Sequence, residues 1–398
     1  MAARGRSSPV GDRAVGRHCG RRHESIVNRI MLLTSSLAGG GAERVIATLA
    51  EHIDPTRFTV TVAHLKERGG VGDELAARGV CVVGIPRSRS RLGRYLSFRA
   101  LGRIVRERRI QLLHSHTTYA LTDGALCRVA SMGAVRLVHT FHFGNYPHYP
   151  GRYVLMERMA SKVASHLVAV GREQRKVLQA LYGIPVGAIS TVLNGTDCPP
   201  SQPDAEWAGR LAGSGRVVVG TTATFIEQKG LDHLLDVAEI LQRDAVPAVF
   251  VVTGDGPLRA RLEARRDAMG LHGMVHFAGW KARAGVTMTP LYDVLLQPSL
   301  WEAMSVVVLE AMGASKPIVA TDVGDNRHVV EDGVTGFIVQ PGDVDAMAAR
   351  LSALVMSEPL RQRLGSAGRH RYEQHYTARV MTREYEDVYH RLLGHRPA

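Results

Sequence analysis

Residues 298–317 read PSLWEAMSVVVLEAMGASKP, and this stretch carries most of the information about the fold. It follows the apolar segment Val294–Gln297, which we expect to be a buried strand, and a helix is expected to begin near Ser305. The first backbone N–H groups of a helix have no partner within it and lie at the positive end of its dipole. We therefore expect the N–H groups of Met304, Ser305 and Val306 to bind an anion such as a diphosphate.

Two glutamates border the same site. Glu302 lies in the loop and Glu310 about one turn into the helix, so both can border one ligand. Carboxylates accept hydrogen bonds from hydroxyl groups, which a nucleotide sugar offers on its ribose and on its sugar. The alternative is that Glu302 only stabilises the helix dipole, and a Glu-x7-Glu spacing alone proves little. The strand–loop–helix context favours the ligand.

Short β-branched segments alternate with helical patterns over almost the whole chain. In the N-terminal half, strands are expected at Arg29–Thr34, Phe58–His64, Cys81–Ile85, Leu112–His116 and Leu137–Thr140, and helices at Ala42–His52, Gly72–Arg78, Ser97–Arg108 and Leu121–Met132. In the C-terminal half, strands are expected at Val217–Thr221, Ala248–Thr253, Val275–Ala278, Val294–Gln297, Pro317–Ala320 and Gly336–Val339, and helices at Leu231–Arg243, Leu258–Met269 and Val306–Gly313. This alternation predicts an α/β protein with two doubly wound parallel sheets, whose ligand lies beyond the carboxyl ends of the strands.

The chain divides into five predicted segments. They are an Arg-rich extension (1–28) that we expect to be disordered, an N-terminal domain (29–195), a Pro- and Gly-containing linker (196–215), a C-terminal domain (216–375) and a final amphipathic helix (376–398). The extension lacks the apolar segment of a secretory signal.

The composition fits a soluble protein of two domains. The 398 residues are 45% hydrophobic, and no apolar run is long enough to cross a bilayer. The four cysteines form no CxxC or Cys/His cluster, so neither a disulfide framework nor a zinc site is expected. A reducing cytoplasm is the predicted location.

Part of the net charge of +13 lies in the basic segment Arg87–Arg109, where arginines alternate with apolar residues at roughly helical spacing. It is either a solvated helix face or a surface that binds anionic lipid at the inner face of the membrane, and the sequence favours neither. A nucleic-acid partner is not expected, because no helix-turn-helix, zinc-finger or RNA-binding signature accompanies the charge.

Further motifs join the 298–317 stretch in a family pattern. They are GGGAER (39–44), VHTFH (138–142), VLNGTD (192–197), TGDGP (253–257) and DGVTG (332–336). Each could be an ordinary turn, but in this order and separation they resemble the retaining GT-B glycosyltransferases of family 4, the glycosyl transferases group 1, from about residue 29 to 393. The resemblance implies two facing Rossmann-like domains, with the acceptor bound by the N-terminal domain and the nucleotide sugar by the C-terminal domain. It implies that the last helix crosses back to the N-terminal domain. It also implies a hexosyltransferase that moves a sugar from a UDP- or GDP-linked donor to an acceptor with retention.

The resemblance also implies residue roles. His142 lies beside the sugar and phosphate, Lys229 neutralises the departing diphosphate, Glu302 meets the donor sugar and Glu310 holds the ribose. The donor-binding residues it implies are Gly40, Gly41, Thr224, Lys229, Gly254, Met304, Ser305, Val306 and Glu310. In the glycine loop, the absence of side chains lets the backbone approach the donor.

One position departs from the family pattern. An arginine usually stands five residues before the lysine, but here that residue is Thr224, which can donate only a neutral hydrogen bond. Either Arg283 or Lys281 replaces the missing charge, or stabilisation of the leaving group is weaker.

No metal or other cofactor is expected. The DxD motif Asp343-Val-Asp345 follows Pro-Gly and precedes a helix, so helix capping explains it better than metal binding. His114 and His116 lie at a strand end, where structural hydrogen bonding is favoured over ligand contact.

Several alternatives remain at this level. The same fold hosts sugar-nucleotide epimerases and hydrolases, and a non-catalytic nucleotide-sugar-binding protein would keep the cleft. For the acceptor, we expect a lipid-linked sugar or glycan in polysaccharide or glycolipid biosynthesis, and a soluble acceptor stays open.

Overall fold

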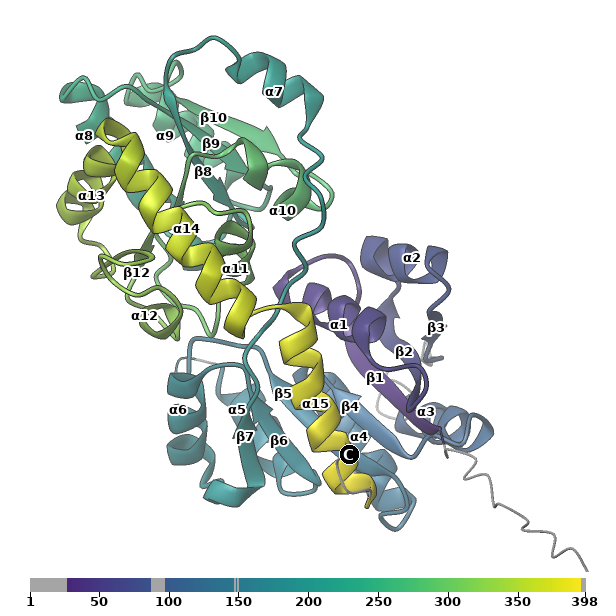
Figure 1. Cartoon of the computed structure of the whole chain (residues 1–398). Coiled ribbons are helices and arrows are strands. Elements are labelled where there is room, and N and C mark those ends of the chain that lie inside the picture. The colour runs from purple at the N-terminus through teal and green to yellow at the C-terminus, as the bar shows by residue number, and fades with distance from the viewer. Residues whose placement is uncertain (1–26, 87–96, 147, 149, 395–398) are drawn as a thin grey trace, which may run out of the picture.

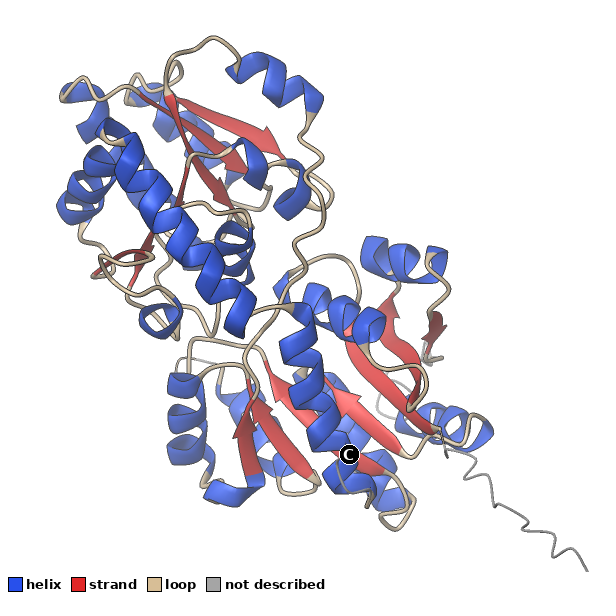
Figure 2. Cartoon of the chain, in the orientation of Figure 1, coloured by secondary structure: helices blue, strands red, loops and turns tan. Residues whose placement is uncertain are grey.

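The computed structural model describes residues 27–86, 97–146, 148 and 150–394, which form two domains, each built on a parallel sheet (Figure 1). Helices cover both faces of each sheet (Figure 2). The α/β fold with two doubly wound domains is therefore confirmed. The predicted extension lies almost wholly outside the described residues.

The N-terminal sheet has seven strands in the order β3-β2-β1-β4-β5-β6-β7. Its strands are β1 (Asn28–Ser36), β2 (Phe58–Glu67), β3 (Cys81–Gly84), β4 (Leu112–Ser115), β5 (Arg136–Phe141), β6 (His166–Ala169) and β7 (Ile189–Thr191). Its helices are α1 (Gly41–His52), α2 (Gly69–Ala77), α3 (Ser97–Glu107), α4 (Thr118–Ala130), α5 (Gly151–Ser161) and α6 (Arg172–Tyr182). The strand order reverses direction between β1 and β4, so a crevice opens at their carboxyl ends.

The C-terminal sheet has six strands in the order β10-β9-β8-β11-β12-β13. Its strands are β8 (Val217–Thr222), β9 (Ala248–Thr253), β10 (Val275–Gly279), β11 (Val294–Gln297), β12 (Ile318–Thr321) and β13 (Gly336–Val339). Its helices are α7 (Ala205–Leu211), α8 (Leu231–Arg243), α9 (Arg259–Ala268), α10 (Ala284–Thr287), α11 (Val306–Gly313), α12 (Asn326–Val329), α13 (Val344–Met356) and α14 (Glu358–His375). Its reversal lies between β8 and β11, so α11 begins at the crevice.

The last helix, α15 (Ala378–Leu393), crosses back to the N-terminal domain, as the resemblance implied. The chain passes between the domains twice, side by side, through a parallel bridge between Thr196 and Thr377. Thr377 then caps α15 by accepting a hydrogen bond from the N–H of Val380. Tyr385 and Tyr389 are fully buried in the N-terminal core, so α15 is an integral part of that domain.

Two features differ from the sequence-based expectations. The predicted linker contains α7, because Asp204 caps that helix and Trp207 is buried in the core of the C-terminal domain. Strands β6 and β7, of four and three residues, were not anticipated.

The basic segment is described only from residue 97 onward. In α3, Leu101 and Val105 are buried in the core of the domain, while Arg99, Arg103 and Arg106 are exposed. The apolar side of this helix therefore packs inside the protein. No helix in the described part of the chain is long and apolar enough to span a membrane.

The contact between α15 and the sheet can be tested at one hydroxyl group. The Tyr389 hydroxyl lies 2.6 Å from Nδ1 of the buried His114, whose Nε2 lies 2.7 Å from the Thr140 hydroxyl. Tyr389→Phe leaves Nδ1 without a partner, so we expect the free energy of unfolding to fall by about 1–3 kcal/mol in urea titrations. Tyr385→Phe is the matched control and should cost less, because Thr140 keeps its bond to His114. Equal losses in the two variants would contradict this account.

Candidate active site

A cavity of about 410 Å³ lies between the domains. The residues proposed from the sequence all line it: Gly40, Gly41, His142, Thr224, Lys229, Gly254, Glu302, Met304, Ser305, Val306 and Glu310. The structure thus brings together predicted residues from five separate stretches of chain, 40–41, 142, 224–229, 254 and 302–310. Their individual roles rest on the chemistry below.

Two helices begin at this cavity from opposite domains. Helix α1 starts after Gly40 and helix α11 after Ser305, and in neither does the residue before the helix cap it with its own side chain. In the first turn of α1 the Glu43 carboxylate accepts hydrogen bonds from the N–H groups of Gly40 and Glu43. The two helix starts lie close together, since a Cβ on Gly41 would be 3.8 Å from Cγ2 of Val306. Two positive dipole ends therefore meet at one place, and the first N–H groups of α11 have no side-chain cap, which suits a diphosphate.

Glu302 is held firmly beside this point. Its side chain is 7% exposed, and Oε1 lies 2.6 Å from Nζ of Lys229 and 2.9 Å from the Ser299 hydroxyl. The side-chain amides of Gln228 and Gln297 also donate hydrogen bonds to its carboxylate, each at a distance of 3.3 Å. Glu302 is thus fixed by side-chain partners, which a glutamate that only stabilises the helix dipole would not need. The same ion pair places a cation at the cavity wall.

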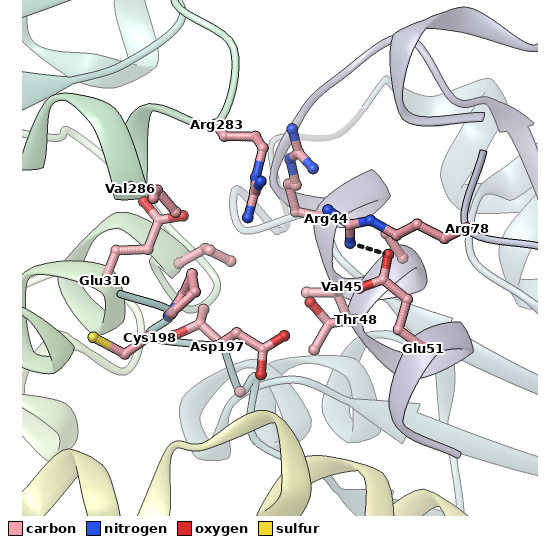
Figure 3. Close-up of a pocket in the computed structure, with 16 residues that line it drawn as sticks. Arg44, Val45, Thr48, Glu51, Arg78, Asp197, Cys198, Arg283, Val286 and Glu310 are labelled. Carbon is pink, nitrogen blue, oxygen red and sulfur yellow. Dashed lines mark hydrogen bonds and ion pairs between the residues drawn. The ribbon is translucent and has the colours of Figure 1, made fainter. Parts of the chain in front are cut away.

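Glu310 lies half-buried at the outer end of the cavity, and loss of solvation raises its pKa to about 7, against the smaller lowering effect of Arg44. Here the cavity continues into a pocket of about 100 Å³, where Glu310 and Arg283 face Arg44 of α1 across the gap (Figure 3). Gly285 lies directly against the carboxylate, since a Cβ there would be 2.5 Å from Cδ of Glu310. This close packing of Gly285 leaves the carboxylate oxygens of Glu310 able to accept hydrogen bonds from the hydroxyl groups of a ligand.

The structure distinguishes the two candidates for the missing cation. Nζ of Lys281 lies 2.8 Å from Oδ2 of Asp204, so its charge is already paired. Arg283 lines the cavity and makes no ion pair with any described residue. Thr224 is exposed at the same cavity. Of the two, Arg283 is the residue with charge available to a ligand.

His142 borders the cavity as a neutral side chain. Burial lowers its pKa to about 4. Its Nε2 lies 3.0 Å from Nδ1 of His116, whose own buried Nε2 has no partner among the described residues. A buried acceptor without a partner is more tolerable than a buried donor, so we assign the proton of this bond to His116. His142 then keeps its Nδ1 proton as a donor. His114 is instead fully hydrogen-bonded within the core, as expected of a structural histidine.

The DxD motif is a helix cap. Oδ1 of Asp343 accepts a hydrogen bond of 2.9 Å from the N–H of Ala346 at the start of α13, which confirms the capping prediction. Within the described ranges, no group of three or more His, Cys, Asp or Glu side chains is placed to hold a metal ion.

Sequence reasoning missed three residues of this site. Arg44 and Gly285 line both cavities, but neither was assigned a role. The side-chain amide of Asn194 donates a hydrogen bond of 3.2 Å to the carbonyl of Met304 and so fixes the loop before α11. The VLNGTD motif offered a signal for Asn194, whereas the position of Gly285 depends on how α10 packs against α11.

The raised pKa of Glu310 makes stability depend on pH. Because the folded state holds the proton more tightly than the unfolded state, the contribution of Glu310 is present below about pH 4.5 and is lost as the pH rises through about 7. Glu310→Gln should remove this pH-dependent loss of stability. At about 1.4 kcal/mol per pKa unit, the loss is at most about 3 kcal/mol of the free energy of unfolding, and it is smaller because the carboxyl group is partly hydrated. Urea titrations at pH 5, 6, 7 and 8 measure it. The exposed Glu227→Gln is the control, and an unchanged pH profile in Glu310→Gln would contradict the assignment.

Comparison with known families matches residues 39–198 to Glycosyltransferase Family 4 and residues 208–371 to Glycosyl transferases group 1. The chain is 30% identical over 318 residues to the D-inositol 3-phosphate glycosyltransferase of Xylanimonas cellulosilytica, which covers 71% of the chain and 73% of the relative. It is 25% identical over 333 residues to the UDP-Gal:alpha-D-GlcNAc-diphosphoundecaprenol alpha-1,3-galactosyltransferase of Escherichia coli, covering 79% of the chain and 84% of the relative. In three further curated relatives, the match spans half of the relative or less.

Among solved structures, HepE of Anabaena in complex with UDP and glucose superposes with a TM-score of 0.80 at 20% identity, covering 91% of the chain and 99% of HepE. This likeness shows the GT-B fold. With both domains matched to the family and a relative of 30% identity aligned over most of its length, the chain belongs to the family 4 glycosyltransferases, the glycosyl transferases group 1, and is a glycosyltransferase enzyme.

Proposed function

We propose that the protein binds a nucleotide sugar in the cavity between its domains and transfers the sugar to an acceptor with retention, without a metal ion. The observation that carries this proposal is the meeting of two helix starts, at Gly41 and Val306, beside the Lys229–Glu302 pair. The diphosphate occupies this cationic point, Glu310 accepts hydrogen bonds from the ribose, and Glu302 accepts them from the sugar.

In the reaction, the bond between the sugar C1 and the phosphate oxygen breaks, and the nucleoside diphosphate leaves with the bonding electrons. The helix starts, Lys229 and Arg283 stabilise the charge that develops on this leaving group, which lowers the barrier more than it tightens donor binding. The acceptor oxygen attacks C1 from the same face, and its proton passes to the departing phosphate oxygen. His142 orients the donor through its Nδ1–H.

For the donor, we propose a UDP-sugar, with a GDP-sugar as the second candidate. Two similar proteins support uridine: the E. coli relative, whose name gives UDP-Gal as its donor, and HepE, whose structure was solved in complex with UDP and glucose.

Nucleotide binding tests the donor site. In the presence of excess EDTA, we expect UDP at about 100 times its dissociation constant to add roughly 2.7 kcal/mol of stability, seen as a higher thermal unfolding midpoint. GDP and ADP should give smaller shifts. Glu310→Ala should abolish the shift, and Gly285→Ala should reduce it because the new methyl group displaces the carboxylate. Gly273→Ala, where a Cβ meets nothing within 4 Å, is the control. A UDP shift that requires a divalent cation would overturn the metal-free mechanism.

For the acceptor, we propose a lipid-linked sugar in polysaccharide or glycolipid biosynthesis, met by a protein that associates peripherally with the inner face of the membrane. The diphosphoundecaprenol-linked acceptor in the name of the E. coli relative supports this, together with the exposed arginines Arg99, Arg103 and Arg106 of α3.

Membrane association has its own test. We expect the protein to co-sediment with vesicles that contain anionic lipid at low ionic strength and to dissociate as salt rises above the range where charges are screened. Exchanging Arg99, Arg103 and Arg106 for glutamine should weaken this binding. Exchanging the exposed Arg363 of α14 and the exposed Arg379 and Arg383 of α15 for glutamine serves as the control. Binding that ignores both lipid charge and salt would contradict the proposal.

A further inference from the structure

A second cavity, of about 400 Å³, lies wholly in the N-terminal domain, beyond the carboxyl ends of β4 and β5. Ala42 and His142 line both this cavity and the donor cavity, so the two adjoin at the residue expected beside the donor sugar. Resting on the function proposed above, we infer that this N-terminal cavity binds an uncharged sugar ring of the acceptor, and that a phosphate carried by the acceptor lies outside it at the rim.

The lining has the chemistry of a carbohydrate site. Phe143, Tyr146, Tyr119 and Tyr153 supply aromatic surface, and the last two meet edge to face with ring centroids 6.0 Å apart. The C–H face of a pyranose is apolar and packs on aromatic rings, while its hydroxyl groups need a few well-placed polar partners. Thr117 before α4 also lines the cavity; its hydroxyl group lies 2.7 Å from that of Ser35 and accepts a hydrogen bond from the N–H of Ala120.

A buried carboxylate keeps this wall in place. Glu157 is 3% exposed and accepts hydrogen bonds from the hydroxyls of Thr118 at 2.5 Å, Tyr146 at 2.7 Å and Tyr182 at 2.8 Å. These three bonds join α4, the segment after β5 and α6. Glu157 is therefore a positioning residue that makes the cavity rigid.

The charge pattern excludes an anion from the interior. No lysine or arginine is among the described residues that line the cavity. The three histidines there, His116, His139 and His142, are neutral at physiological pH because burial lowers their pKa values, that of His139 to about 3 and that of His142 to about 4. A phosphate group inside would lose its hydration without gaining a counter-charge.

Cations instead stand at the rim. Nζ of Lys66 lies 5.3 Å from the centroid of the Tyr119 ring, and Cζ of Arg152 lies 4.8 Å from that of Tyr153. Among the described residues, the two aromatic rings thus separate an interior without cations from two positive charges outside. This order of groups matches an acceptor whose terminal sugar is neutral and whose linking phosphate follows it, and it does not match a small acceptor that carries phosphate on the reacting ring.

The test uses the full-length protein and two panels of probes. One panel holds neutral p-nitrophenyl hexosides and N-acetylhexosaminides, and the other holds hexose 6-phosphates and inositol phosphate. Binding is measured by saturation-transfer NMR without nucleotide, and transfer is measured with UDP-sugars. We expect at least one neutral glycoside to bind. Tyr119→Ala should weaken that binding about tenfold and raise the acceptor KM without changing UDP affinity, and Tyr119→Phe should restore it.

Tyr153→Ala is the second variant, should Tyr119→Ala fail to fold, and the exposed Val129→Ala on the same helix as Tyr119 is the control. Preferential binding of phosphorylated probes, or neutral binding that ignores both tyrosines, overturns the inference. If UDP binds but no neutral glycoside does, the inference fails while the donor site stands. If a neutral glycoside binds but no nucleotide does, the donor proposal fails while the sugar cavity stands.

Discussion

The loop before α11 is the constraint on which the arrangement of the molecule depends, because both domains hold it. From the C-terminal side, Ser299 and Lys229 fix the Glu302 carboxylate. From the N-terminal side, the backbone at Gly144 lies so close that a Cβ would be 2.2 Å from the carbonyl carbon of Glu302. No side chain fits there without displacing the loop. The contact between the domains therefore also positions the loop that carries Glu302.

The same region ties the domains together electrostatically. Asp325 is completely buried, and its carboxylate accepts hydrogen bonds of 2.8 and 3.0 Å from the N–H groups of Arg172 and Glu173. It thereby caps α6 of the other domain, a role usually filled from within the helix's own sequence. With the double crossing at Thr196 and Thr377, these contacts hold the cavity from two sides. A change in their geometry would alter the distance between the two helix starts.

Much of the fold was predictable because its signals are local. Buried parallel strands appear as β-branched runs, and the segments around β8, β9 and β11 were placed within a residue of their ends. The cavity residues could be named because the family motifs fall at strand ends, where a doubly wound sheet binds its ligand. Strand β7, of three residues, carries no such pattern and is stabilised by its neighbour β6.

What could not be predicted depends on contacts between distant segments. The sequence could not separate Arg283 from Lys281, because the partner of Lys281 is Asp204 in a stretch that resembled a linker. The close approach of Gly285 to Glu310 and the rim formed by Tyr119 and Tyr153 likewise arise only from packing. Local pattern thus determines where chemistry is possible, and tertiary packing determines which charges remain available for it.

The two cavities have different electrostatic roles in the proposed reaction. Negative charge develops on the donor side, where Lys229, Arg283 and the two helix starts lower its energy. The stabilisation is largest if no competing cation lies nearby to bind the diphosphate in a second position. A neutral acceptor cavity meets that condition. His142, uncharged and shared by both cavities, can contact donor and acceptor without attracting the phosphate away from Lys229. Replacement of the usual arginine by Thr224 fits the same proposal, because Arg283, which lies between β10 and α10, lines the donor cavity and makes no ion pair with any described residue.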